Sequence, residues 1–308
     1  MAGHDAVLLI SFGGPSAMDE VRPFLANVLR GRPAPPARVE EVVRHYELIG
    51  GRSPLTELTL RQAAALRGQL GTSAHALPVY VGMRNWHPYL HESLAAMRDA
   101  GLHRAVGIIL AAQQSDASWG RYQRDVDEAR ARVGWLAPRV DFAPNWHAHP
   151  LFIEALTERT QAALATLSPE RRRGVGLVFT AHSLPVALAA VSPYEAQLRV
   201  GAALVAAQLG FTEHRLAYQS RSGAPREPWL EPDIGAVVRE EAARGTRELV
   251  IVPLGFVCDH VEVLYDLDIE AKQIADAVGI GFTRAAAVND HPSFIRMLAT
   301  LVAATAGA

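Results

Sequence analysis

Short apolar runs that alternate with longer helix-like stretches constrain the fold of this chain more than any other feature. There are six such runs, and several are rich in Val and Ile and apolar on both faces, as strands are in a sheet covered on both sides. They are residues 6–12, 78–83, 105–111, 174–181, 214–219 and 249–257. Alternation of strands and helices predicts an α/β fold with parallel sheets and right-handed crossovers.

The six runs form two sets of three, separated near residues 145–150. A length of 308 residues suits two α/β units of ordinary size. We therefore predict two similar doubly wound domains, over residues 1–148 and 149–308. The last apolar stretch, 291–306, is expected to be a docked helix, and packing back on the N-terminal domain is one arrangement open to it.

Charge and cysteine content exclude several classes of protein. Lys and Arg number 30 against 32 Asp and Glu, with no basic run, so no nucleic-acid partner is expected. The single cysteine, Cys258, cannot form an internal disulfide and cannot alone hold an iron–sulfur cluster. The N-terminus lacks the features of a signal peptide, and no apolar segment approaches the roughly 20 residues of a membrane span. These features predict a cytoplasmic protein without a membrane span.

Ligand sites in open parallel sheets lie beyond the carboxyl ends of the strands, and unusual residues follow several of the predicted strands here. His182 comes directly after one of them. Near neutral pH its imidazole could act as a base or a metal ligand, or it could simply bond a loop carbonyl. The residue by itself leaves these alternatives open.

An acidic pattern is more informative. In a helix, Glu262, Asp266 and Glu270 are spaced i, i+4 and i+8 and would form one stripe, with almost no basic residue before Lys272. Such a stripe is often a solvated helix face. Because this one begins just after an apolar strand, we favour a path that passes a hydrated divalent cation inwards.

Two other features carry weaker signals. Ser53, in a Gly/Pro turn before a helix, either binds an anion with neighbouring amides or only caps the helix. Arg30 either binds substrate carboxylates or is merely exposed. The pair Gly13–Gly14 lacks the G-x-G-x-x-G pattern, which counts against dinucleotide binding and a nucleotide-dependent oxidoreductase.

Seven segments, taken in order, resemble those of the ferrochelatases along nearly the whole chain. They are SFGGP at 11–15, YELIGGRSP at 46–54, GMR at 82–84, AHSLP at 181–185, YQSRSG at 218–223, WLEP at 229–232 and GFVCDHVE at 255–262. The resemblance implies two Rossmann-like, chelatase-like domains with a porphyrin cleft between them. It also implies a metal chelatase of the lyase class that inserts Fe²⁺, as substrate, into a porphyrin in haem biosynthesis.

The resemblance also implies roles for individual residues. His182 and Glu262 match the metal-insertion pair, and Asp266 and Glu270 match acidic positions that bind metal further out. Which member of the pair takes the pyrrole protons is left open. Six other positions match the porphyrin-binding set: Phe12, Arg30, His45, Tyr46, Ser53 and Tyr122.

Two of these positions depart from some relatives. Phe12 stands where some have a Tyr that ligates the product iron, and His45 stands where some bacterial members have Arg. Ser53 and Tyr122 match contacts to the substrate's carboxylates, and Arg30 matches a basic position near the propionates.

Several sequence segments are most similar to those of actinobacterial-type ferrochelatases, a branch associated with coproporphyrin III. Many of those relatives hold a [2Fe–2S] cluster, whereas this chain has only Cys258, where relatives often have Ser, so no cluster and no tightly bound cofactor is expected. We expect a monomer that transiently contacts the next enzyme of the haem pathway. The alternatives are a protoporphyrin IX ferrochelatase, a cobalt or nickel chelatase, and a non-catalytic porphyrin- or haem-binding protein.

Overall fold

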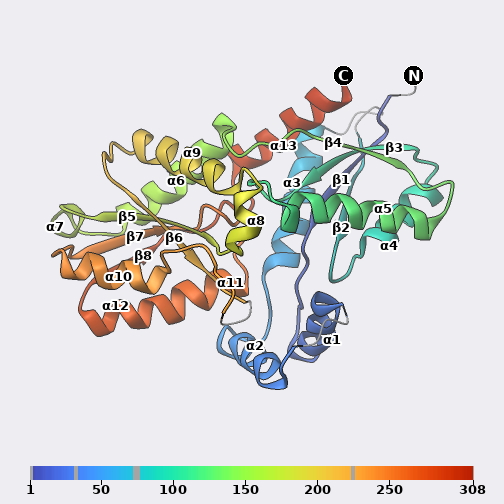
Figure 1. Ribbon diagram of the computed structural model, residues 1–308. Helices are drawn as coiled ribbons and strands as arrows, with labels where there is room; N and C mark the ends of the chain where they lie inside the picture. Colours follow the sequence, from blue (N-terminus) through green and yellow to red (C-terminus); the bar gives the residue numbers. More distant parts are fainter. Residues whose placement is uncertain (1–2, 31–33, 72–76, 223–225, 308) are drawn as a thin grey trace. The chain divides into compact units, whose positions relative to one another are not determined.

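The computed structural model describes residues 3–30, 34–71, 77–222 and 226–307. Contacts between Cα atoms divide the chain into two compact units. Unit 1 comprises Met1–Ala111, Ala117–Asn145 and Asp290–Ala308, and unit 2 comprises Ala112–Asp116 and Trp146–Asn289. The chain thus returns to unit 1 for its C-terminal helix (Figure 1).

Unit 1 contains a four-stranded parallel sheet in the order β2-β1-β3-β4. Its strands are β1 (Ala6–Ser11), β2 (Val79–Met83), β3 (Arg104–Ile109) and β4 (Arg139–Phe142). Every residue of β1 is buried, because this strand lies inside the sheet and has helices on both faces. Its uninterrupted apolar sequence is what such a position requires.

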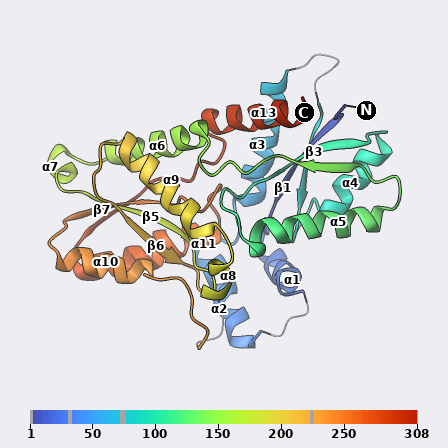
Figure 2. The ribbon, with the colours of Figure 1, turned by 45° about the horizontal axis from the view of Figure 1, so that its top comes forward.

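The helices of unit 1 pack in pairs. α3 (Leu55–Leu70) contacts α13 (Pro292–Ala306), and α4 (Leu90–Asp99) contacts α5 (Arg121–Val133). The two pairs cover opposite faces of the sheet (Figure 2). Between β1 and α3, the helices α1 (Met18–Leu29) and α2 (Pro36–Leu48) contact each other.

Unit 2 repeats this topology with a parallel sheet in the order β6-β5-β7-β8. Its strands are β5 (Gly176–His182), β6 (Arg215–Gln219), β7 (Glu248–Val252) and β8 (Gly281–Arg284). Here α6 (Pro150–Ala165) packs with α9 (Tyr194–Gln208), and α10 (Ile234–Ala243) packs with α12 (Lys272–Val278). Each unit is therefore a doubly wound α/β structure, as predicted.

All six predicted strands are present, but two further strands were missed. β4 and β8 are edge strands of four residues each, and both contain charged side chains, in the sequences RVDF and GFTR. An edge strand is covered less completely than a central one, so its sequence does not need to be apolar. The run 249–257 also ends as a strand at Val252 and continues as a loop.

The remaining helical segments of unit 2 are short. They are α7 (Pro169–Arg172), α8 (Val186–Ala190) and α11 (Val261–Leu264). Two π-helical segments also occur, η1 (Asp116–Gly120) and η2 (Asp266–Ala271). Within the described ranges, no helix is both long enough and apolar enough to cross a membrane.

Candidate active site

The predicted insertion pair lies at the carboxyl ends of the strands of unit 2. His182 is the last residue of β5 and is in register with Gln219, the last residue of β6. Glu262 is in α11, which follows the loop after β7. Because β5 pairs with both β6 and β7, these three segments reach the same edge of the sheet.

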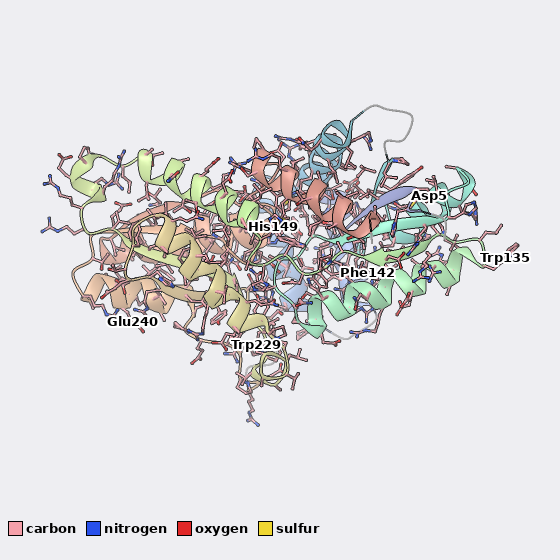
Figure 3. All side chains as sticks on the ribbon, turned by 90° about the horizontal axis from the view of Figure 1, so that it is seen from above. Asp5, Trp135, Phe142, His149, Trp229 and Glu240 are labelled. Atoms are coloured by element: carbon pink, nitrogen blue, oxygen red, sulfur yellow. The ribbon has the colours of Figure 1, made fainter. Side chains whose placement is uncertain are left out.

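The side chains of His182 and Glu262 face each other. Nε2 of His182 lies 3.6 Å from Oε1 of Glu262, and the two side chains are 28% and 40% exposed. Nδ1 of His182 lies 2.5 Å from the carbonyl oxygen of Ser183. A carbonyl can only accept, so Nδ1 donates and Nε2 is the nitrogen left for a proton or a metal. The indole ring of Trp229, labelled in Figure 3, lies 6.5 Å from the imidazole between ring centroids.

The surroundings of His182 favour its charged form. Burial by itself would lower the pKa of the imidazole, but the carboxylate of Glu262 and the carbonyl of Ser183 outweigh it and raise the pKa to about 9. Glu262 thus stabilises the imidazolium form of His182.

A second imidazole, which the sequence analysis did not single out, also approaches Glu262. Nε2 of His260 lies 3.9 Å from Oε2 of Glu262. Burial lowers the pKa of His260, which keeps this imidazole neutral. The available signal was its place in the segment 255–262, two residues before Glu262.

Asp266 is the second member of the predicted acidic stripe, and it is buried. Its Oδ2 is hydrogen-bonded to Oγ of Ser220, which follows β6. Burial raises the pKa of Asp266 to about 7, and the negative charges of Glu262 and Glu270 contribute to the shift. The charges of Glu262 and Glu270 thus influence the pKa of Asp266, and those of Glu262 and Asp266 influence the pKa of His182.

The segment that carries the stripe is helical but is not one regular α-helix, the geometry on which the i, i+4 and i+8 stripe depends. α11 ends at Leu264, and η2 then covers Asp266–Ala271 before α12 begins. In η2 the amide of Glu270 donates to the carbonyl of Tyr265, five residues back, at 2.9 Å. Such a π-segment offsets the side chains from the i, i+4 rows, and π-segments are frequent at functional sites.

Two acidic residues near the stripe form ion pairs with an arginine that the sequence pattern did not reveal. Arg284, the last residue of β8, lies 2.9 Å from Asp259 and 2.5 Å from Asp268. This partner was missed because β8 was not recognised as a strand. Across the described parts of the chain, no group of three or more His, Cys, Asp or Glu side chains is arranged to hold a metal ion.

Three of the predicted porphyrin contacts lie together in unit 1. The guanidinium of Arg84, after β2, lies 5.7 Å from the ring centroid of Phe12 and 5.9 Å from that of Tyr122. Nη1 of Arg30 lies 2.7 Å from Oδ1 of Asp125. Asp125 also pairs with Arg84, at 2.8 Å from Nε. Arg84 and the buried Asp125 therefore connect Phe12 just after β1, Arg30 at the C-terminal end of α1 and Tyr122 on α5.

The other predicted contacts lie near the same loops. Phe12 and Tyr46 both pack edge-on against Phe24, with ring centroids 6.2 and 6.4 Å apart respectively. His45, next to Tyr46 on α2, is partly buried, and burial lowers its pKa.

Ser53 is buried beside the turn that follows β1. Its amide donates to the carbonyl of Pro15 at 2.8 Å, and its Oγ accepts from the amide of Leu55 at 3.3 Å. A Cβ on Gly14 would lie 2.9 Å from the Cβ of Ser53, so glycine is needed there for close approach. Ser53 thus makes a local turn contact, whereas the N-cap of α3 is Pro54 and has no side-chain hydrogen bond.

Known proteins resemble this chain over nearly its whole length. The chain matches the family model described as ferrochelatase over residues 4–306. A coproporphyrin III ferrochelatase of Mycolicibacterium smegmatis is 42% identical over 301 residues, which cover 97% of this chain and 88% of that protein. A protein of the same name from Nocardia farcinica is 43% identical over 306 residues, covering 97% and 87%.

Solved structures support the fold. SirB from Bacillus subtilis with Fe³⁺ superposes with a TM-score of 0.62 at 12% identity, covering 98% of this chain and 96% of that chain. The sirohydrochlorin chelatase SirB in complex with cobalt, from Bacillus subtilis subspecies spizizenii, gives a TM-score of 0.59 at 12% identity, covering 99% and 96%. At this identity the likeness concerns the fold alone.

Proposed function

The chain belongs to the ferrochelatase family, and from that premise we propose that it is a coproporphyrin III ferrochelatase with His182 and Glu262 as its insertion pair. It inserts Fe²⁺ into coproporphyrin III, giving Fe-coproporphyrin III and two protons. The observation that carries this proposal is the facing of the His182 imidazole and the Glu262 carboxylate, 3.6 Å apart at the carboxyl ends of a doubly wound sheet. The names of the curated relatives support the choice of coproporphyrin III.

The chemistry requires both a base and a transient metal ligand. Two pyrrole N–H protons leave the macrocycle as Fe²⁺ enters it, and bending of the ring exposes the nitrogen lone pairs. His182 presents Nε2, since Nδ1 is held by the Ser183 carbonyl, and Glu262 presents a half-exposed carboxylate. A carboxylate and an imidazole that has given up its own proton both accept protons and both bind Fe²⁺, so either residue could take either role.

The porphyrin contacts are proposed for unit 1. Arg30, Ser53 and Tyr122 meet the carboxylates of the substrate, while Phe12, His45 and Tyr46 line its surroundings. Phe12 cannot ligate the product iron, because its ring has no donor atom. We further propose a cytoplasmic monomer that hands its product to the next enzyme of the pathway.

Parallel anaerobic assays with Fe²⁺ and either coproporphyrin III or protoporphyrin IX test the substrate. We expect kcat/KM to be at least about tenfold higher for coproporphyrin III, a difference of about 1.4 kcal/mol in transition-state binding. Faster turnover of protoporphyrin IX would show that this porphyrin is the substrate instead. Absence of product from both porphyrins would contradict ferrochelatase activity. A series with Co²⁺ and Ni²⁺ tests the alternative of another chelatase, in which Fe²⁺ is the poorest metal.

Asp266 and Glu270 are proposed to bring Fe²⁺ to the pair. The double variant Asp266→Asn with Glu270→Gln should raise the Fe²⁺ concentration for half-maximal rate by about tenfold, since it removes two carboxyl groups that can ionise and bind the cation. The KM for the porphyrin should stay within about twofold. Anaerobic rates over a range of Fe²⁺ concentrations provide the measurement.

The matched control is Asp268→Asn, on the same helix. Asp268 pairs with Arg284 and is not one of the three stripe carboxylates, so its Fe²⁺ dependence should match that of the wild type. An unchanged Fe²⁺ dependence in the double variant would show that the stripe is an ordinary solvated helix face.

A further inference from the structure

Gln219, at the end of β6, makes a hydrogen bond to each of the two segments that carry the insertion pair. Its backbone carbonyl accepts from the amide of Ser183 at 2.8 Å, directly after His182. Its side-chain Nε2 donates to the backbone carbonyl of Glu262 at 2.6 Å. The residue is 2% exposed, so water does not compete for these bonds.

We propose that Gln219 is a positioning residue that sets the separation between the His182 imidazole and the Glu262 carboxylate. This inference rests on the proposed function of that pair. Gln219 does not reach the reacting atoms, and it acts through the backbone at Ser183 and Glu262.

The two ends of this connection differ in how well they are otherwise held. His182 is part of β5, and its backbone carbonyl also accepts from the buried hydroxyl of Tyr194 at 2.9 Å. Glu262 belongs to α11, which has only four residues. A helix of that length has little stability of its own, because nucleation is costly. The side chain of Gln219 therefore matters most for the position of Glu262.

The hydrogen bonding of the Gln219 amide also points to this role. The Glu262 carbonyl can only accept, which identifies the nearby side-chain atom as Nε2. In the part of the chain that the structure describes, Oε1 of Gln219 is buried without a hydrogen-bond partner. An unpaired buried carbonyl is unfavourable, and an apolar side chain of similar length would avoid it. The single bond to Glu262 is thus the contribution that a glutamine makes here.

The variant Gln219→Met tests the inference, because methionine keeps the length of the side chain and the backbone acceptor but loses the N–H donor. We expect kcat for Fe²⁺ insertion to fall about tenfold or more, as it does when reacting groups are misplaced by about 1 Å. The KM for coproporphyrin III should stay within about twofold. A crystal structure of the variant should show His182 Nε2 and Glu262 Oε1 further apart than the 3.6 Å of the wild type.

Thr160→Val is the matched control in the same unit. It removes one buried hydrogen bond, from Thr160 Oγ1 to the carbonyl oxygen of Leu156 at 2.7 Å, within α6. Its melting temperature should fall by about as much as that of Gln219→Met, with kcat unchanged. A kcat for Gln219→Met within twofold of the wild type, or an equal loss of kcat in both variants, would overturn the inference. An unchanged distance in the pair would also overturn it, even if the wild type did not turn over the porphyrin, so this failure is separate from failure of the proposed function.

Discussion

Replacing His182 by alanine is expected to abolish Fe²⁺ insertion while porphyrin affinity stays within about twofold of the wild type. The change removes Nε2, the atom that faces Glu262 at 3.6 Å, and with it one of the two groups proposed to accept a proton or hold the metal. General acid–base catalysis contributes about 10²–10⁴-fold in rate, and loss of a metal ligand adds to this. Anaerobic turnover gives the rate, and quenching of porphyrin fluorescence gives the affinity.

His214→Ala is the matched control for this experiment. His214 comes directly before the first residue of β6, at the end of that strand opposite Gln219, and its ring packs edge-on against Phe179 at 5.6 Å. Its replacement should leave turnover near normal. Near-normal turnover of His182→Ala would remove the central role of the pair, and loss of porphyrin binding in that variant would make His182 a binding residue.

Replacing Asp125 by alanine is expected to lower the free energy of unfolding by about 3 kcal/mol, because it leaves buried positive charge without its partner. Three arginines approach this carboxylate, with distances of 2.7 Å from Arg30, 2.8 Å from Arg84 and 3.0 Å from Arg121. Asp125 is 3% exposed and Arg84 only 12%, so water screens this group poorly. Urea denaturation with constant m-value provides the measurement.

The same variant should also raise the KM for the porphyrin, because Arg30 and Arg84 lose the anion that orients them. Asp127→Ala, two residues away on α5, is the control. Asp127 is 73% exposed and lies 3.9 Å from Arg130, so its loss should change stability by less than about 0.5 kcal/mol. A decrease in the free energy of unfolding below about 1 kcal/mol for Asp125→Ala would show that water solvates the arginines well enough without this carboxylate.

Some features of this protein could be predicted because they depend on local sequence. The central strands β1, β5 and β7 are buried on both faces, and burial on both faces demands an apolar run whatever the neighbours are. The order of strands and helices then determined the fold class. The motifs around His182 and Glu262 indicated the site through resemblance, although their residue types alone left other roles open.

Other features depend on partners that are distant in the sequence. β4 and β8 are strands because they pair with β3 and β7, and their own sequences have little strand character. Arg121 lies four residues before Asp125 on the same helix. Arg30 and Arg84, in contrast, lie outside α5, so no spacing in the chain reveals them as partners of Asp125. The same holds for Arg284, because its strand β8 was not predicted and its partners Asp259 and Asp268 lie on other segments.

By itself, the sequence determined the doubly wound fold, the position of His182 at a strand end and the order of the three acidic residues. Only the tertiary structure decided that Nδ1 of His182 is held by Ser183, that His260 lies near the second carboxylate oxygen of Glu262, and that Gln219 connects the two segments. The physical reason is that a strand buried on both faces requires apolar side chains at consecutive residues, which can be read from the sequence. The distance between two side chains, in contrast, is set by strand order and by hydrogen bonds between segments far apart in the chain.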